Sequence, residues 1–195
     1  MEVKPRLLAF AGSTRRDSYN KKLVRQAVMG AQAAGVEVTL IDLAEFPLPL
    51  FDEDLEKEQG LPANAQRLKT LFLSHAGFLI ASPEYNSSIS GVLKNVIDWV
   101  SRPVAGAANL AEFKGKIAAL MSASPGALGG LRGLVHLRAI LGNVGVLVLP
   151  DQVAIPEAFQ AFDDSGKLKD IKKQEAVEKL GRDAAVLVRK INAES

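Results

Sequence analysis

Five short apolar runs, each about the length of one strand, recur along the chain and alternate with segments of helical periodicity. The runs cover residues 7–11, 36–43, 77–82, 116–122 and 144–149. Most are continuous rather than alternating, which is typical of strands buried on both faces of a parallel sheet. Helical patterns occupy residues 20–34, 63–75, 91–101, 128–141 and 170–191. This alternation predicts an α/β fold in which helices cover both faces of one parallel sheet.

The expected strand order is 2-1-3-4-5, because crossovers between parallel strands are right-handed and the chain supplies five strands. In that order, the ligand crevice lies at the carboxyl ends of the first, third and fourth strands. Three polar loops with unusual residues follow these same strands. Their positions predict a binding site at this edge of the sheet. Because the 195 residues show no internal repeat and no linker, we expect a single domain over residues 1–195.

The composition excludes several kinds of site and partner. The chain has no cysteine, so it has no disulfide, thiolate zinc site or cysteine nucleophile. With only two histidines, a metal site is not expected. The 24 basic and 22 acidic residues nearly balance, which argues against nucleic-acid binding. No segment approaches the roughly 20 apolar residues of a membrane helix, and the start lacks a signal-peptide pattern. We expect a cytoplasmic protein without a membrane partner.

A polar loop follows the first strand and ends where a helix begins. Its candidate binding residues are Ser13, Thr14, Arg15, Ser18 and Asn20. A helix start offers free N–H groups and a positive dipole end, and arginine adds a charge-assisted bond, so the loop suits a phosphate. The sequence here is neither a Walker loop nor G-x-G-x-x-G. The alternative is that Ser18 or Asn20 merely caps the helix. Arg16 is interpreted as a solvated or interface charge.

The segment after the third strand combines a polar loop, Pro83-Glu84-Tyr85-Asn86, with an apolar helix over residues 91–101. The helix is apolar at positions 92, 93, 96, 97, 99 and 100. Such a stripe is wider than a helix on the surface of a monomer requires. It predicts a contact with a second subunit. The alternative is a helix buried deep within its own monomer.

Several other residues have two interpretations. Residues 44–62 contain three prolines and an acidic run. They are expected to form a solvated surface loop, with or without a helical turn, or to pack beside a ligand or partner. His75 and His136 are expected to be surface or packing residues rather than acid–base groups. Glu84 is expected to be structural or to pair with a nearby base. Arg132 is a candidate partner for Tyr85 or Glu84, or else an ordinary exposed charge.

Two spaced motifs follow the first and third strands. They read Gly12-Ser13-x-Arg15-x-x-Ser18-x-Asn20, and Ser82-Pro83-Glu84-Tyr85-Asn86 followed by Gly91-x-Leu93-Lys94-Asn95-x-x-Asp98-Trp99. Together they resemble the NAD(P)H-dependent FMN reductase family, a flavodoxin-like group that includes quinone, chromate and azo-dye reductases. The resemblance covers nearly the whole chain in strand order. One departure is Ser90-Gly91, where relatives often have Pro-Gly, which would alter the stiffness of the loop.

The resemblance implies non-covalently bound FMN, with NADPH or NADH as the hydride donor. Quinones are the implied acceptors, together with free flavin, chromate or azo dyes. Ser13, Arg15, Ser18 and Asn20 would bind the FMN phosphate, and Thr14 belongs to the same loop. The flavin ring would be lined by Pro83, Glu84, Tyr85 and Asn86. A third loop beside the ring would contain Ser122, Ser124 and Gly126. Family members are usually dimers or tetramers, so a homodimer or homotetramer is expected.

In this interpretation the flavin carries out the redox chemistry, and no catalytic side chain is expected. Hydride would pass through flavin N5 in a ping-pong sequence, and the helix opened by the Gly126 turn could place N–H groups near flavin N1. One alternative is a flavodoxin-type electron carrier, but such carriers are usually strongly acidic, whereas the net charge here is +2. Another is a flavin-free interaction module on the same fold.

Overall fold

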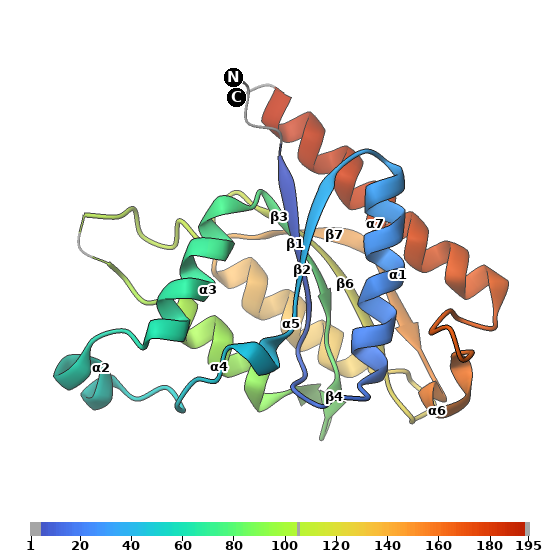
Figure 1. Cartoon of the computed structure of the whole chain (residues 1–195), viewed down its shortest axis with the longest axis horizontal. Coiled ribbons are helices and arrows are strands. Elements are labelled where there is room, and N and C mark those ends of the chain that lie inside the picture. Colours follow the sequence, from blue (N-terminus) through green and yellow to red (C-terminus); the bar gives the residue numbers. More distant parts are fainter. Residues whose placement is uncertain (1–4, 105, 194–195) are drawn as a thin grey trace.

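The computed structural model describes residues 5–104 and 106–193, and it shows a sheet between two layers of helices (Figure 1). The strands are β1 (Arg6–Ala11), β2 (Glu37–Ile41), β3 (Gly77–Ala81), β4 (Glu84–Tyr85), β5 (Ser88–Ile89), β6 (Ile117–Ala123) and β7 (Leu147–Ile155). The helices are α1 (Tyr19–Ala33), the 3₁₀ turn η1 (Leu43–Glu45), α2 (Glu53–Gln59), α3 (Ala63–Ser74), α4 (Gly91–Val100), α5 (Leu131–Asn143), α6 (Ala158–Ala161) and α7 (Ile171–Ala193).

The main sheet has the order β2-β1-β3-β6-β7, and every neighbouring pair is parallel. This confirms the predicted order 2-1-3-4-5, counted over the five long strands. Parallel pairing brings the carboxyl ends of all five strands to one edge, which is the lower edge in Figure 1. The small antiparallel hairpin of β4 and β5 lies at this edge. Among the helices of the described ranges, none combines the length and apolar character needed to cross a membrane.

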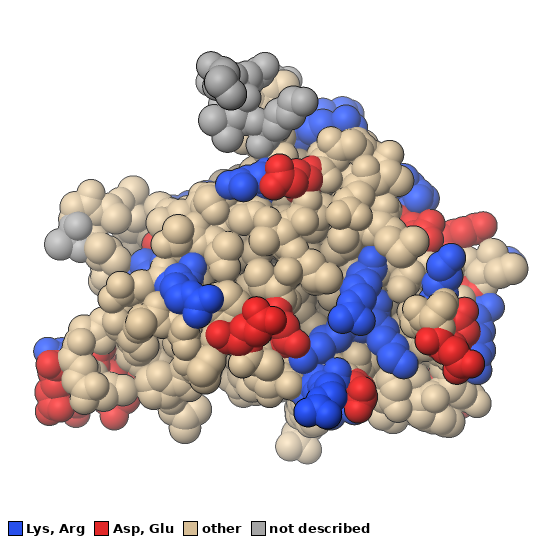
Figure 2. All heavy atoms as spheres, viewed as in Figure 1, with Lys and Arg blue, Asp and Glu red and all other residues tan. Residues whose placement is uncertain are grey.

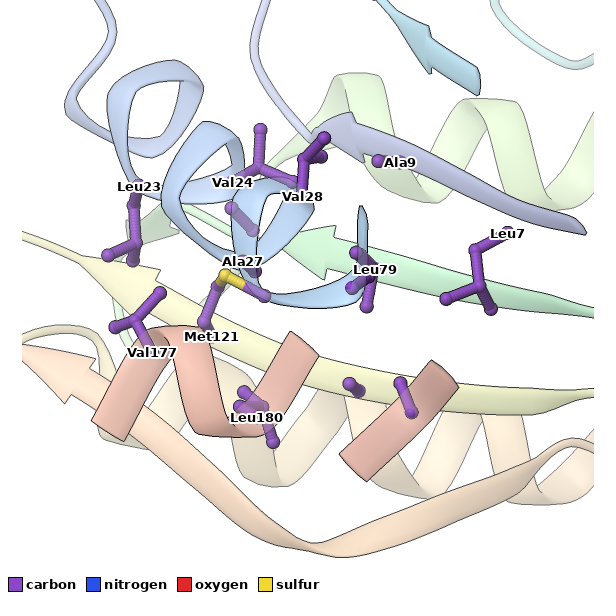
Figure 3. Packing of buried hydrophobic residues seen from close by; sticks show 14 of the residues in the cluster. Leu7, Ala9, Leu23, Val24, Ala27, Val28, Leu79, Met121, Val177 and Leu180 are labelled. Carbon is purple, nitrogen blue, oxygen red and sulfur yellow. The ribbon is translucent and has the colours of Figure 1, made fainter. Parts of the chain in front are cut away.

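The sheet separates two hydrophobic cores because successive side chains of a strand point to opposite faces. On β1, Leu7 and Ala9 belong to the core under α1 and α7, which Figure 3 shows from close by. Leu8 and Phe10 belong to the core under α3, α4 and α5. Both faces are therefore apolar, which explains why the strand sequences are continuous rather than alternating.

Helices α1 and α7 approach each other so closely that two glycines are required at their contact. A Cβ atom at Gly30 would lie 2.0 Å from the carbonyl oxygen of Glu178, and one at Gly181 would lie 1.9 Å from that of Ala27. No side chain fits at either position, because real Cβ atoms do not approach backbone so closely. This contact fixes α7 against α1, whose first turn lies at the binding edge of the sheet.

The last strand differs from its prediction, which placed it at residues 144–149 and ended it at Pro150. Strand β7 begins at Leu147 and continues through Pro150 to Ile155. The ladder contains an irregularity here, since Ala118 pairs with Val148 but Leu120 pairs with Gln152. An edge strand accepts proline at such a bulge, because the missing N–H is not needed by a neighbour. Arg138 on α5 donates to the carbonyl oxygens of Val148 and Pro150, at 3.5 and 3.3 Å.

Helix α5 also begins later than predicted, at Leu131 rather than at residue 128. The two residues before it, Gly129 and Gly130, have φ angles of +62° and +93°. These angles lie outside the right-handed helical region, and glycine adopts them without strain. The glycine pair therefore delays the helix and sets the direction in which it leaves the edge of the sheet.

The wide apolar stripe of α4 is covered by this chain itself. Five of its six apolar residues are at most 4% exposed, namely Leu93, Val96, Ile97, Trp99 and Val100, and the sixth, Val92, is partly buried against the same core. The indole Nε1 of Trp99 donates to the carbonyl oxygen of Pro49 at 2.8 Å, and the Phe51 ring meets the Trp99 ring edge-on with centroids 5.0 Å apart. Asn95 donates to Pro49 and accepts from the Phe51 N–H, each at 2.8 Å. The prediction that this stripe faces a partner is therefore wrong, and the monomer-buried alternative is correct.

The acidic segment that supplies this cover is partly helical, because Asp52 caps α2. The Asp52 carboxylate accepts from the N–H groups of Asp54 and Leu55, at 2.8 and 3.5 Å. Arg102, just after α4, donates to Glu56 of α2 at 2.8 Å, and its guanidinium lies 5.1 Å from the centroid of the Phe51 ring. Residues 47–56 are thus held on α4 rather than forming only a solvated loop.

His75 is buried at the end of α3 and acts as a packing residue, as the sequence predicted. Its Nδ1 lies 2.6 Å from the carbonyl oxygen of Leu71, which can only accept, so Nδ1 carries the proton. Its Nε2 lies 2.8 Å from the Thr39 hydroxyl and accepts from it. Burial lowers the pKa of His75 from its ordinary value of 6.5. The neutral ring is therefore the form that stabilises the fold.

We expect the free energy of unfolding to fall as the pH decreases through 6.5, because the unfolded chain then binds a proton that the folded His75 resists. The stabilisation is complete above the ordinary pKa and is lost as the pH falls toward the lowered pKa of the folded state. Urea unfolding between about pH 8 and about pH 5 measures the effect. His75→Gln should flatten this pH dependence. The same dependence of unfolding free energy on pH in wild type and His75→Gln would contradict the conclusion that neutral His75 stabilises the fold.

Candidate functional site

The loops after β1, β3 and β6 meet at the carboxyl edge of the sheet and enclose a cavity of about 310 Å³. Its lining residues are Ser13, Arg15, Ser18, Tyr19, Asn20, Pro83, Glu84, Tyr85, Ala123, Ser124 and Pro125. The structure therefore brings together residues from all three loops in which the sequence predicted a site. This arrangement follows from the strand order, because β1, β3 and β6 are neighbours in the sheet.

The loop after β1 presents hydrogen-bond donors at the start of α1. Ser18 is the N-cap residue, yet its hydroxyl makes no capping bond, and the first turn of α1 contains no acidic residue. The Ser13 hydroxyl accepts from the Arg15 N–H at 3.3 Å and so holds the loop in shape. The positive end of α1 and the Ser18 hydroxyl are thus available to an anion. The predicted alternative, in which Ser18 only caps the helix, does not describe this geometry.

Asn20 reinforces the site rather than offering a free side chain. Its side-chain Nδ2 donates to the carbonyl oxygen of Ala123, and its Oδ1 accepts from the Ala123 N–H, both at 2.9 Å. Asn20 is 3% exposed, so the two bonds form in a buried place. They fix the start of α1 to the end of β6. The prediction that Asn20 also binds the phosphate stays a prediction, because the amide nitrogen carries two protons and only one of them is used in this bond.

The surface around this loop is basic. Figure 2 shows Lys and Arg side chains gathered over α1 and the loop before it. The basic residues of this stretch are Arg15, Arg16, Lys21, Lys22 and Arg25. Asp17 lies among them, and Lys21 is paired with Asp42 at 2.6 Å. The unpaired excess favours approach of an anionic ligand to the cavity.

The loop after β3 is a tight hairpin rather than an irregular loop. Glu84 and Tyr85 of β4 pair with Ser88 and Ile89 of β5, and the turn residues Asn86 and Ser87 have φ angles of +48° and +66°. Two left-handed residues form the turn that best matches the twist of a hairpin, which is an ordinary place for asparagine. The hairpin presents Pro83, Glu84 and Tyr85 to the cavity, whereas Asn86 is not part of the lining.

Ser90 ties this hairpin to the first loop. Its hydroxyl donates to the carbonyl oxygen of Gly12 at 2.6 Å and accepts from the Leu93 N–H at 3.1 Å. The same hydroxyl therefore caps α4 and joins the carboxyl ends of β1 and β3. Ser90 stands where relatives often have proline, and the sequence alone did not show whether the loop is stiff without it. The structure shows that hydrogen bonding restrains this loop.

Glu84 links the hairpin to α5. Its carboxylate accepts from the Gly133 N–H at 2.8 Å and lies 3.4 Å from Nε of Arg132. This confirms Arg132 as the partner of Glu84. The carboxylate also occupies the positive end of α5, which the sequence had assigned to a flavin. One N–H group of the first turn is therefore already bonded within the chain, and the expectation that this helix start lies near flavin N1 stays a prediction.

The third loop contributes less than predicted. Ser124 lines the cavity and accepts from the Gly126 N–H at 3.4 Å, but Gly126 itself is not in the lining. Ser122 is fully buried, and its hydroxyl has no hydrogen-bond partner. It lies under the start of α5, since a Cβ atom at Gly130 would be 1.8 Å from its Oγ. Ser122 therefore lies behind the site rather than in it.

Thr14 lies on the far side of the first loop, where it faces Leu43, Phe46 and Val92 around a separate cavity of about 160 Å³. Four predicted residues are thus outside the main lining: Thr14, Asn86, Ser122 and Gly126. Tyr19 and Ala123 line the cavity but were not named as binding residues. Tyr19 could have been found, since it lies inside the motif between Ser18 and Asn20. His136, on α5, is bonded to the Ser88 hydroxyl at 3.0 Å and does not line the cavity.

Comparisons with known proteins place the chain in one family. Residues 5–160 match the model of the NADPH-dependent FMN reductase family. An NAD(P)H-dependent FMN reductase of Pseudomonas aeruginosa is 37% identical over 174 residues, which cover 89% of each chain. A quinone reductase of Escherichia coli is 34% identical over 153 residues, 76% of each chain.

Two solved structures are also similar. A flavoenzyme NAD(P)H:(acceptor) oxidoreductase of Paracoccus denitrificans superposes with a TM-score of 0.76 at 27% identity, covering 95% of this chain and 98% of that one. A flavodoxin from an archaeon superposes with a TM-score of 0.60 at 14% identity, covering 94% of this chain and 99% of that one. The second likeness concerns the fold alone.

Proposed function

Because the chain belongs to the family of NADPH-dependent FMN reductases, we propose that it passes electrons from NADPH or NADH to quinones or similar small acceptors. The chain is an FMN-dependent oxidoreductase that uses NAD(P)H. The observation that carries the site assignment is the cavity between the loops after β1, β3 and β6, with anion donors at one end and the hairpin at the other. The names of the quinone-reducing relatives support quinones as acceptors, with free flavin, chromate and azo dyes as further candidates.

The residues around the cavity fit FMN. The phosphate end has the uncapped start of α1, the free hydroxyl of Ser18 and the exposed guanidinium of Arg15. These groups suit a dianion. The other end has Pro83 and the aromatic ring of Tyr85, which is 57% exposed. A planar ring system requires such an apolar wall, so both ends of the cavity match the two chemically different ends of the cofactor.

We assign binding and orientation, rather than covalent catalysis, to the residues of this chain. FMN, when bound, would supply the redox chemistry, which is the transfer of hydride and electrons between nucleotide and acceptor. Ser13, Arg15 and Ser18 hold the phosphate, with Asn20 fixing the helix start on which they depend. Pro83, Glu84 and Tyr85 line the ring, and Ser124 lies beside it. Ser90 and the bonds from Glu84 to α5 keep the hairpin in a single position.

Donor and acceptor are proposed to use the same cavity in turn, because no second nucleotide-binding fingerprint occurs in the sequence. Initial rates of NADPH and NADH oxidation with a soluble quinone test this order. We expect parallel lines when the reciprocal rate is plotted against the reciprocal nucleotide concentration at several fixed quinone concentrations. Intersecting lines would exclude a ping-pong order, and no oxidation of either nucleotide with quinone, free flavin, chromate or an azo dye would exclude the proposed function.

An electron carrier without its own NAD(P)H activity is not favoured. Carriers of the flavodoxin type use acidic surfaces to dock their redox partners. The surface beside this cavity is basic, and the whole chain has a net charge of +2 (Figure 2). The activity of this chain is therefore assigned to small acceptors, and its location is proposed to be the cytoplasm, where NAD(P)H is available.

A homodimer or homotetramer remains our proposal, but on a surface other than α4. Four exposed apolar residues occur on the hairpin and at the start of α5: Tyr85, Leu128, Leu131 and Val135, which are 41–58% exposed. Leu131 and Val135 lie one turn apart and share a face of the helix. This surface adjoins the cavity, and a second copy would cover it. Light scattering at micromolar concentration tests the proposal; a monomeric mass would overturn it, and Val135→Asp should reduce the mass of the oligomer.

A further inference from the structure

A column of two stacked aromatic rings, each with a cationic side chain near it, stands beside the phosphate end of the cavity. The guanidinium carbon of Arg15 lies 5.3 Å from the centroid of the Tyr19 ring. The Tyr19 ring is stacked on Phe162, with centroids 6.3 Å apart and planes only 2° from parallel. Nζ of Lys22 lies 5.9 Å from the Phe162 centroid. These distances are those of cation–π contacts and an offset aromatic stack.

The base of this column is fixed firmly. Phe162 is 8% exposed and forms a bridge with Leu168, at the two ends of the turn over residues 163–167. Within this turn, the Asp163 N–H donates to the carbonyl oxygen of Lys167 at 2.9 Å. Gln26 on α1 donates to the carbonyl oxygen of Gly166 at 2.8 Å. The segment between α6 and α7 is therefore attached to the helix that also carries Tyr19, so the stack has a rigid support.

The top of the column is an exposed arginine, which would otherwise move freely. A long side chain loses rotamer freedom when it binds a ligand, and that loss opposes binding. A guanidinium resting on an aromatic face has already lost part of this freedom, while its N–H groups stay in the plane and can still donate to a phosphate. Arg15 and Tyr19 both line the cavity. The aromatic pair is thus placed to organise Arg15 before the ligand arrives.

We propose that Tyr19 and Phe162 are positioning residues that hold the Arg15 guanidinium ready for the FMN phosphate, and that they thereby set the preference for FMN over unphosphorylated riboflavin. The proposal rests on the assignment of Arg15 to the phosphate made under the proposed function. It adds a role for the segment after α6, which contributes no residue to the cavity lining. The competing explanation is that the two rings only pack α1 against this segment.

The test measures FMN and riboflavin affinities of the apoprotein by flavin fluorescence. Tyr19→Leu should weaken FMN binding roughly two- to tenfold, the range expected for one cation–π contact, and leave riboflavin binding unchanged. Tyr19→Phe keeps the ring and should retain most of the FMN affinity. Phe162→Leu removes the supporting ring and should also weaken FMN binding. It provides the test if Tyr19→Leu does not fold. Phe159→Leu, at a 61% exposed residue nearby, is the matched control and should leave both affinities unchanged.

The effect must also depend on Arg15. In an Arg15→Ala background, Tyr19→Leu and Phe162→Leu should no longer change FMN affinity. Equal losses for FMN and riboflavin, or losses that persist without Arg15, would overturn the proposal in favour of simple packing. If Arg15→Ala weakens FMN binding but neither aromatic variant does, the positioning role alone is overturned. If Arg15→Ala has no effect, the phosphate assignment is wrong and the positioning role is overturned with it.

Discussion

Arg15→Ala is expected to weaken FMN binding by about 1.5–3 kcal/mol, roughly ten- to 150-fold, because it removes a hydrogen bond between charged groups. Arg15 is exposed at the mouth of the cavity, next to the uncapped start of α1 and the Ser18 hydroxyl. The remaining donors still bind phosphate, so the loss should be partial. Titration of the apoprotein with FMN, followed by quenching of flavin fluorescence, measures it.

The specificity of this effect depends on the phosphate. Riboflavin lacks the phosphate, so its affinity should be nearly unchanged in Arg15→Ala. Arg15→Lys keeps the charge but loses the two-pronged geometry, and it should fall between wild type and Arg15→Ala. Arg16→Ala is the matched control, since Arg16 is an adjacent exposed arginine that does not line the cavity. Equal FMN affinities for Arg15→Ala and wild type would show that the first loop is misassigned.

Trp99→Ala is expected to lower the free energy of unfolding by about 3–5 kcal/mol, the usual cost of deleting a large buried ring. Trp99 lies on α4 and is fully buried beneath the segment that contains Pro49 and Phe51. Its removal leaves a cavity, and the carbonyl oxygen of Pro49 loses a donor. Urea unfolding, monitored by circular dichroism, measures the loss.

A second variant separates packing from hydrogen bonding at this position. Trp99→Phe keeps most of the buried ring but not the bond to Pro49, so it should cost about 1–2 kcal/mol. Because Trp99 is the only tryptophan in the chain, its emission reports on this contact alone. The emission should be blue-shifted and independent of protein concentration. A concentration-dependent emission would contradict the conclusion that this chain alone covers α4.

Much of the fold was predictable because local sequence and global structure agree. The continuous apolar runs at β1 and β3 require helices on both faces, and the count of five strands then leaves few topologies. The same logic placed the site, since the strand order alone decides which loops meet. Arg15 and Ser18 were identified because their spacing matches a loop that opens a helix. Their surroundings in the structure support the proposed phosphate role.

The sequence was least informative where a residue's partner lies far away in the sequence. It identified Asn20 as a polar residue of the first loop, but not its two hydrogen bonds to Ala123, more than a hundred residues later. Trp99 reads as an unpaired apolar residue until Pro49 and Phe51 are placed over it. Pro150 reads as the end of a strand unless the strand is known to be at an edge. In each case the sequence shows the chemistry of the side chain but not the neighbour that decides its use.

The most direct test of the central claim is the visible absorption of the FMN-loaded protein under anaerobic conditions. Addition of NADPH or NADH should bleach the flavin band, and subsequent addition of a quinone should restore it. Both steps should occur with flavin that remains bound to the protein through gel filtration. A protein that retains no FMN, or whose flavin band is unchanged by both nucleotides, would contradict its assignment as an NAD(P)H-dependent FMN enzyme.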